Sequence, residues 1–145
     1  MIKIICVGKI KESYLNELIN DYLNRIKKYH KIEIIEVKDN DNQSFETKEL
    51  TKIINDKDYN IALVINGKKY NSIDFAKYIN QKFINNANIS FVIGGSNGLE
   101  QNILDKCDDF ISFSDFTFPH GLFRGILLEQ IYRSFKINNN ETYHK

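Results

Sequence analysis

The residues most able to do chemistry lie in the last third of the chain. The first group is the glycine-rich segment Gly94–Gly98, which follows the apolar run Ile89–Ile93. Glycines let a ligand approach the backbone closely, and free N–H groups at the start of a helix donate hydrogen bonds. The spacing matches neither a dinucleotide fingerprint nor a P-loop. The segment therefore indicates either a ligand-binding loop or a tight turn. Asn97-Gly98 fits a hairpin turn, and Asn97 with Glu100 fits a helix capping box.

The second group is the hydroxyl-rich segment Ser112–His120. A strand pattern ends here and a helix pattern begins, with Thr117 expected as the N-cap and Pro119 near the first helical position. Ligands of parallel sheets bind beyond the carboxyl ends of the strands. We expect this segment and the glycine-rich one to follow adjacent elements of one sheet and to form the walls of one pocket. The alternative is an ordinary strand-to-helix connection.

The third group lies on the last helix, expected from Pro119 to Ile137, and on the tail that follows it. The apolar side chains of this helix are Leu122, Phe123, Ile126, Leu127, Ile131 and Phe135. Its polar set includes Arg124, Glu129, Gln130, Arg133 and Lys136. The apolar face indicates either core or a homodimer seam. By composition alone, the tail Glu141–Lys145 is expected to be frayed.

Apolar β-branched runs alternate with amphipathic stretches along the whole chain. Strands are expected at 2–7, 32–37, 61–65, 89–93 and 110–113, and helices at 12–28, 45–54, 72–83, 99–107 and 119–137. Asn66-Gly67 is expected to turn the chain, and Asn71 or Ser72 to cap a helix. This alternation predicts an α/β fold with a mainly parallel sheet and helices on both faces.

Length and composition exclude several classes of protein. With 145 residues, of which 42% are hydrophobic, the chain is expected to form one domain over 1–145 rather than a disordered segment. Two cysteines without CxxC or Cys/His spacing indicate no metal site and a reduced, cytoplasmic protein. No signal peptide and no membrane-spanning run are expected. Lys and Arg number 20 against 19 Asp and Glu, so no global signature of nucleic-acid binding is present.

An ordered set of motifs nevertheless resembles a known family. The motifs are Phe91–Leu99, Ser112–Ser114, Thr117–His120, Arg124, Glu129–Ile137 and Tyr143-His144, with Val7–Lys11 and Ile34–Val37 near the start. They are similar to the ribosomal RNA large subunit methyltransferase H family of the SPOUT superfamily, over nearly the whole chain. The resemblance implies an α/β fold whose C-terminal part is threaded into a deep trefoil knot, which is an exception to the rule against knots.

The resemblance also implies a function. Members of this family are homodimeric cytoplasmic enzymes that use S-adenosylmethionine, release S-adenosylhomocysteine and need neither metal nor membrane. They methylate N3 of pseudouridine 1915 in the 23S rRNA of the assembled ribosome. By resemblance, cofactor contacts fall on Leu63, Gly94, Phe113, Ser114, Asp115, Phe116, Thr117 and Phe118. RNA-binding candidates are His120, Arg124 and Lys136, and catalytic candidates are Arg133, Tyr143 and His144.

Some roles stay open at this point. Tyr143 is a candidate to stack on the base, and Arg133 and His144 are candidates either to take its proton or to stabilise developing charge on its carbonyls. Asp115, Gly121 and Gly125 depart from what the family and a helix favour. Two alternative functions stay open. The first is a noncatalytic ribosome- or RNA-binding module of the same fold, and the second is a nucleotide-binding α/β protein. A neutral chain would bind RNA through a local basic cluster, for which the candidates are Arg124, Arg133, Lys136 and Lys145.

Overall fold

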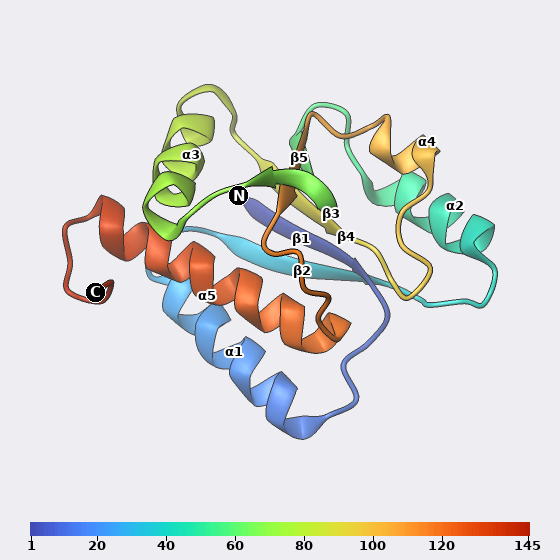
Figure 1. Ribbon diagram of the computed structural model, residues 1–145, viewed down its shortest axis with the longest axis horizontal. Helices are drawn as coiled ribbons and strands as arrows, with labels where there is room; N and C mark the ends of the chain where they lie inside the picture. Colours follow the sequence, from blue (N-terminus) through green and yellow to red (C-terminus); the bar gives the residue numbers. More distant parts are fainter.

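The computed structural model describes residues 1–145 as one five-stranded sheet with helices packed on both faces (Figure 1). The elements follow in the order β1 (Ile2–Val7), α1 (Ser13–Lys27), β2 (Ile32–Val37), α2 (Gln43–Ile53), β3 (Tyr59–Lys69), α3 (Ser72–Asn85), β4 (Ile89–Ile93), α4 (Gln101–Leu104), β5 (Asp109–Ser112) and α5 (His120–Asn138). None of the helices is both long and apolar enough to cross a bilayer.

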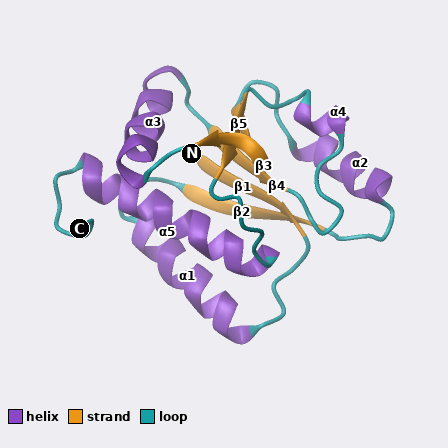
Figure 2. Ribbon diagram, in the orientation of Figure 1, coloured by secondary structure: helices purple, strands orange, loops and turns teal.

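All five strands are parallel, in the order β2-β1-β4-β3-β5 (Figure 2). β1 lies inside the sheet, with Ile2 opposite Ile32 of β2 on one side and Ile89 of β4 on the other. Because side chains alternate along a strand, one run of apolar residues fills both faces of the sheet. Ile4 belongs to one core cluster and Ile5 to the other, and both are fully buried.

The two faces of the sheet carry separate cores. The larger core receives Ile19 of α1, Ile79 of α3 and Leu127 of α5. The smaller core receives Leu50 of α2 and Ile103 of α4. This arrangement confirms the predicted α/β fold with helices on both faces. The knot that the resemblance implies is consistent with this topology and stays a prediction.

Strand β3 is longer than expected, and the predicted turn at Asn66-Gly67 is wrong. β3 continues to Lys69, with a register shift between Leu63 and Lys68 where it pairs with β5. A Cβ atom on Gly67 would lie 2.7 Å from the backbone nitrogen and carbonyl carbon of Ile111. The glycine therefore lets two backbones approach closely instead of reversing the chain.

Two of the expected helix caps are wrong, and a third is confirmed. α4 begins only at Gln101 with no side-chain cap, and the Asn97 amide donates to the carbonyl oxygen of Asn40 instead of closing a capping box. α5 begins at His120 behind Pro119, without a cap from Thr117. Asn71 does cap α3, because its side chain accepts a hydrogen bond from the backbone N–H of Asp74 at 2.8 Å.

The glycines of α5 mark a close approach between helices. α1 and α5 run side by side (Figure 1), and a Cβ atom on Gly121 or Gly125 would lie 2.8 Å from a methyl group of Leu15 or Leu18, respectively. Glycine costs about 1 kcal/mol relative to alanine inside a helix. Here the absence of a side chain lets α5 pack tightly against α1, and this packing fixes the direction in which α5 leaves the sheet.

Candidate functional site

A cavity of about 390 Å³ opens at the carboxyl ends of strands β4 and β5, beside the middle of β3. Its walls are Leu63, Val64, Ile65, Ile93, Gly94, Gly95, Ser96, Gly98, Leu99, Ile111, Ser112, Phe113, Ser114, Phe116, Thr117, Phe118, His120 and Phe123. Apolar side chains and backbone make up most of this surface, and His120 supplies the imidazole at the start of α5. Carboxyl ends of parallel strands are the usual place for ligands in such sheets.

The glycine-rich wall of the cavity is a tight turn. The N–H of Gly98 donates to the carbonyl oxygen of Gly95 at 3.0 Å, and the two residues form an isolated antiparallel bridge. Gly98 has a φ of 73°, which favours glycine. A Cβ atom on Gly94 would lie 2.8 Å from the carbonyl carbon of Gly98. The two interpretations of this segment are therefore compatible, since the tight turn itself lines the cavity.

The opposite wall is the loop from Phe113 to Phe118. The Ser112 hydroxyl donates to the carbonyl oxygen of Ser114 at 3.2 Å, and the Ser114 hydroxyl accepts from the N–H of Phe116 at 3.0 Å. Phe113 packs edge-on against Phe123, with ring centroids 5.3 Å apart. Phe118 stacks on the same Phe123 ring, with centroids 6.2 Å apart. Local hydrogen bonds and aromatic packing therefore hold this loop in shape.

The sequence led us to expect that the two loops follow adjacent strands, and this expectation is wrong. β3 lies between β4 and β5 in the sheet, so the loops face each other across the middle of β3. This arrangement explains why Leu63 and its successors on β3 form part of the cavity wall. Sequence reasoning missed Ile65, Leu99 and Phe123. Leu99 and Phe123 lie beside the two loop motifs, whereas Ile65 lies on β3, two residues after the predicted Leu63.

All predicted cofactor residues line the cavity except Asp115. The Asp115 carboxylate points elsewhere and forms an ion pair with Lys69 at the end of β3. Both side chains are more than half exposed. Asp115 is therefore placed to tie the loop to the sheet rather than to touch a ligand in the cavity.

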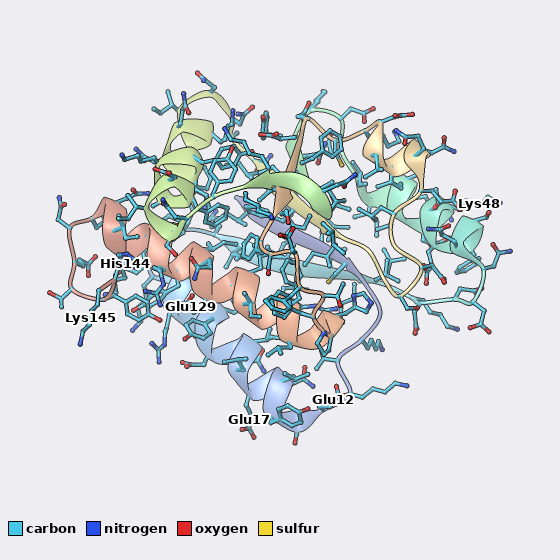
Figure 3. All side chains as sticks on the ribbon, in the orientation of Figure 1. Glu12, Glu17, Lys48, Glu129, His144 and Lys145 are labelled. Carbon is cyan, nitrogen blue, oxygen red and sulfur yellow. The ribbon has the colours of Figure 1, made fainter.

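The three catalytic candidates meet at the other end of α5. Arg133 donates from Nε to the Glu129 carboxylate at 2.9 Å, and its Nη2 contacts the same oxygen. Arg133 Nη1 lies 3.0 Å from Nδ1 of His144, and the Tyr143 hydroxyl donates to Glu129 at 3.2 Å. Figure 3 shows Glu129 and His144 near each other at this end of the molecule. The sequence placed Glu129 on a polar helix face and in a family motif, without a role, so its central position is new.

The tail is ordered, and the prediction of a frayed end is wrong. The Tyr143 ring packs edge-on against Tyr132, with centroids 4.9 Å apart, and the guanidinium of Arg133 lies over the Tyr143 ring. Glu141 accepts hydrogen bonds from Tyr29 and Lys136 at 3.0 Å. Burial, followed by the hydrogen bond with Tyr22, raises the pKa of Tyr143 further above its ordinary value, which already lies well above neutral pH.

Two of the RNA-binding candidates are not free to meet RNA in this structure. Arg124 was expected on a polar face but is only 3% exposed, with Nη1 2.6 Å from Glu36 and Nη2 donating to the carbonyl oxygen of Gly8 at 3.2 Å. It therefore joins α5 to the ends of β1 and β2. Lys136 is paired with Glu141. Of the four residues of the expected basic cluster, only Lys145 takes part in none of the ion pairs.

The cavity and the catalytic candidates lie far apart within one chain. His120 lines the cavity and begins α5, whereas Arg133 lies thirteen residues further along the same helix. At about 1.5 Å per residue, this separation is about 20 Å along the helix axis. No three side chains of His, Cys, Asp or Glu are close enough together to hold a metal ion.

Comparisons with known proteins point in one direction. A family model described as "Predicted SPOUT methyltransferase" matches residues 1–144. A protein of Fusobacterium nucleatum named ribosomal RNA large subunit methyltransferase H is 46% identical over an alignment of 153 residues, which covers 99% of both chains. A protein of the same name from Enterococcus faecalis is 45% identical over 157 residues, again with 99% coverage.

A solved structure supports the fold. The probable methylase family protein from Haemophilus influenzae Rd KW20 superposes with a TM-score of 0.59, at 14% sequence identity, over 99% of this chain and 70% of that one. At this identity, the likeness concerns the arrangement of helices and strands alone.

Proposed function

Since the chain belongs to the SPOUT methyltransferase family, we propose that it methylates N3 of a pseudouridine in large-subunit ribosomal RNA, pseudouridine 1915 by the family's numbering, with S-adenosylmethionine as donor. The observation that carries the proposal is the cavity at the ends of β4 and β5, which is lined by all the residues expected to bind the cofactor except Asp115. The proposed substrate is the assembled ribosome in the cytoplasm.

The cavity suits such a cofactor. Its volume of about 390 Å³ lies in the range of about 300–1,000 Å³ that is usual for small-molecule sites. Leu63 and Phe118 offer apolar surface for the adenine ring, and the backbone of the Gly94 and Phe113–Phe118 segments offers amides and carbonyls for its polar edge. When bound there, the cofactor would supply the methyl group that N3 of the base takes up in exchange for its proton, which would pass to water.

A homodimer would bring together what one chain keeps apart. The cavity and the Arg133 cluster are about 20 Å apart along α5, too far to act on the same methyl group. In the proposed dimer, the cluster of one chain faces the cavity of its partner. Each active site then uses two chains, with Tyr143 positioning the base, Arg133 and His144 near its carbonyls, and His120 at the rim of the cavity.

The low net charge fits a substrate that is already folded. With a net charge of +1 and most basic candidates ion-paired, the chain lacks the broad basic surface that binds RNA through counterion release. A preassembled ribosomal surface supplies shape, so fewer phosphate contacts are needed. Lys145 and the partner's copy of this residue would contribute charge beside the two tails.

The test uses ribosomes from a strain that lacks the modification. After incubation with the protein and the methyl donor, mass spectrometry of the nucleosides should show N3-methylpseudouridine. Calorimetry should show cofactor binding. Absence of binding at millimolar cofactor would contradict the proposal and favour a noncatalytic ribosome-binding module. Tight binding of ATP instead would favour a nucleotide-binding protein.

A further inference from the structure

Glu129 is the centre of the hydrogen-bond network at the end of α5. We propose that Glu129 is a positioning residue which, through Arg133, fixes His144 as a hydrogen-bond donor to the target base rather than as the base that removes its proton. This inference rests on the proposed function and specifies how the cluster serves it. It also separates two roles that the residue types alone leave open.

The first step is the contact between Glu129 and Arg133. The Arg133 guanidinium reaches one carboxylate oxygen through both Nε and Nη2, and both side chains are less than a quarter exposed. Two charged hydrogen bonds hold a planar guanidinium in one orientation. The Glu129 carboxylate is the principal cause that raises the pKa of Arg133, so this group stays charged. Nη1 is thereby left as the group directed to the tail.

The second step is the contact between Arg133 and His144. Nη1 of Arg133 lies 3.0 Å from Nδ1 of His144. A guanidinium has only donors, so Nδ1 must be the acceptor and the proton of the neutral ring must be on Nε2. The hydrogen bond of His144 within the chain is made through Nδ1, so Nε2–H is the polar group that the ring offers to a substrate. A neutral ring with its acceptor nitrogen occupied donates a hydrogen bond and has no free site for a proton.

The third step concerns Tyr143, which the same carboxylate holds. Its hydroxyl lies 3.2 Å from Glu129 and 3.4 Å from the hydroxyl of Tyr22, and its raised pKa keeps it protonated. The Tyr143 proton is donated to Glu129, so the donor that the cluster offers to the base is Nε2–H of His144. Loss of the N3 proton leaves negative charge on the flanking carbonyl oxygens, which such donors stabilise. The proton itself passes to water.

The role of His144 is tested by two substitutions. His144→Gln keeps an N–H donor near the position of Nε2 and cannot act as a base at neutral pH, whereas His144→Ala keeps neither property. With ribosomes as substrate, we expect kcat to fall about 100-fold in His144→Ala and less than about 10-fold in His144→Gln. Equal loss in the two variants would overturn the donor role.

The role of Glu129 is tested by Glu129→Gln, with Glu49→Gln as control. Glu49 forms an exposed pair with Lys52 on α2, far from α5 in sequence, so its loss removes one carboxylate without touching the cluster. In Glu129→Gln, kcat should fall about 10–100-fold through misplacement of Arg133. KM for ribosomes should stay constant or fall, because the charge of Arg133 is no longer neutralised. An unchanged kcat, or a kcat that falls only together with cofactor binding and melting temperature, would overturn the proposal.

A further measurement is independent of activity. Hydrogen exchange of residues 139–145 should be faster in Glu129→Gln than in both the wild-type chain and Glu49→Gln, because the tail loses its contact with the carboxylate. Equal exchange in all three would overturn the positioning role. If the wild-type chain methylates no ribosome while the exchange result holds, the proposed function fails and the assignment of Glu129 as the residue that orders the tail stands.

Discussion

The two ends of helix α5 carry two different kinds of site. At its start, the cavity is made of backbone, glycines and aromatic rings, and its loops are bonded mainly within themselves. At its end, charged and phenolic side chains are bonded to one another around Glu129. The first site has space for a ligand and little charge. The second has charge, and neither Arg133 nor His144 lines the cavity at the other end, so neither end alone is equipped to carry out a methyl transfer.

Under the proposed function, this contrast assigns cofactor binding to the start of α5 and stabilisation of the base to its end. Binding of a cofactor needs shape and backbone hydrogen bonds, which a rigid sheet edge supplies. Stabilising charge on a nucleobase needs oriented donors, which side chains with fixed partners supply. The following changes should affect one end and spare the other, if the division is correct.

The largest effect is expected from removing the tail. Deletion of Tyr143–Lys145 removes two of the three catalytic candidates and leaves Arg133 bonded only to Glu129. Methyl transfer to ribosomes should fall by about 1,000-fold or more, because residues that act as a unit lose most of their effect together. The cofactor dissociation constant measured by calorimetry should change less than about threefold, because the cavity is at the other end of the helix. Unchanged turnover would show that the tail is not catalytic.

The next effect is expected from filling the glycine-rich turn. Gly94→Ala places a methyl group 2.8 Å from the backbone of Gly98, so the cavity wall must shift. Cofactor binding should weaken by about 100-fold, while hydrogen exchange of the tail stays as in the wild-type chain. Gly98→Asn is the matched control, since a Cβ atom there meets nothing within 4 Å and asparagine tolerates the positive φ. Equal binding by the two variants would contradict this account of the cavity.

The smallest effect is expected from the ion pair between Lys69 and Asp115. Asp115→Asn removes an exposed pair that ties the cavity loop to β3. Such pairs contribute at most about 1 kcal/mol and are screened by salt. Cofactor binding should weaken by about twofold in low salt and by less in high salt. Lys106→Met, which breaks the exposed pair with Asp56 elsewhere, should leave binding unchanged. A loss above about tenfold in Asp115→Asn would show that the cavity depends on charge after all.

Local patterns predicted the architecture well. β1, β2 and β4 end where the sequence indicates, because buried parallel strands are continuous apolar runs and leave little choice of boundary. Local pattern gave the wrong prediction at Asn66-Gly67. The conformation there depends on the backbone of β5, more than forty residues later in the chain. The sequence alone does not distinguish a glycine within a strand from a glycine in a turn, because the difference depends on the neighbouring strand.

The sequence predicted which residues form the site, but not which residues they pair with. The resemblance named the cavity residues and the catalytic candidates. It could not show that Asp115 forms an ion pair with Lys69, or that the buried Arg124 forms one with Glu36. Ion pairs join residues that are distant in sequence, so spacing contains no signal for them. The tail shows the same limit, because its order comes from Tyr29, Tyr132 and Glu129 rather than from its own composition.

The most direct test of the division mixes two inactive chains. Gly94→Ala loses the cavity and Arg133→Ala loses the cluster, so a heterodimer of the two retains one site made from the intact half of each chain. The purified heterodimer should recover about half of the wild-type rate on ribosomes. Arg133→Ala mixed with the tail-deleted chain is the control and should stay inactive, because both lesions fall in the cluster. An inactive heterodimer of Gly94→Ala and Arg133→Ala would contradict an active site shared between two chains.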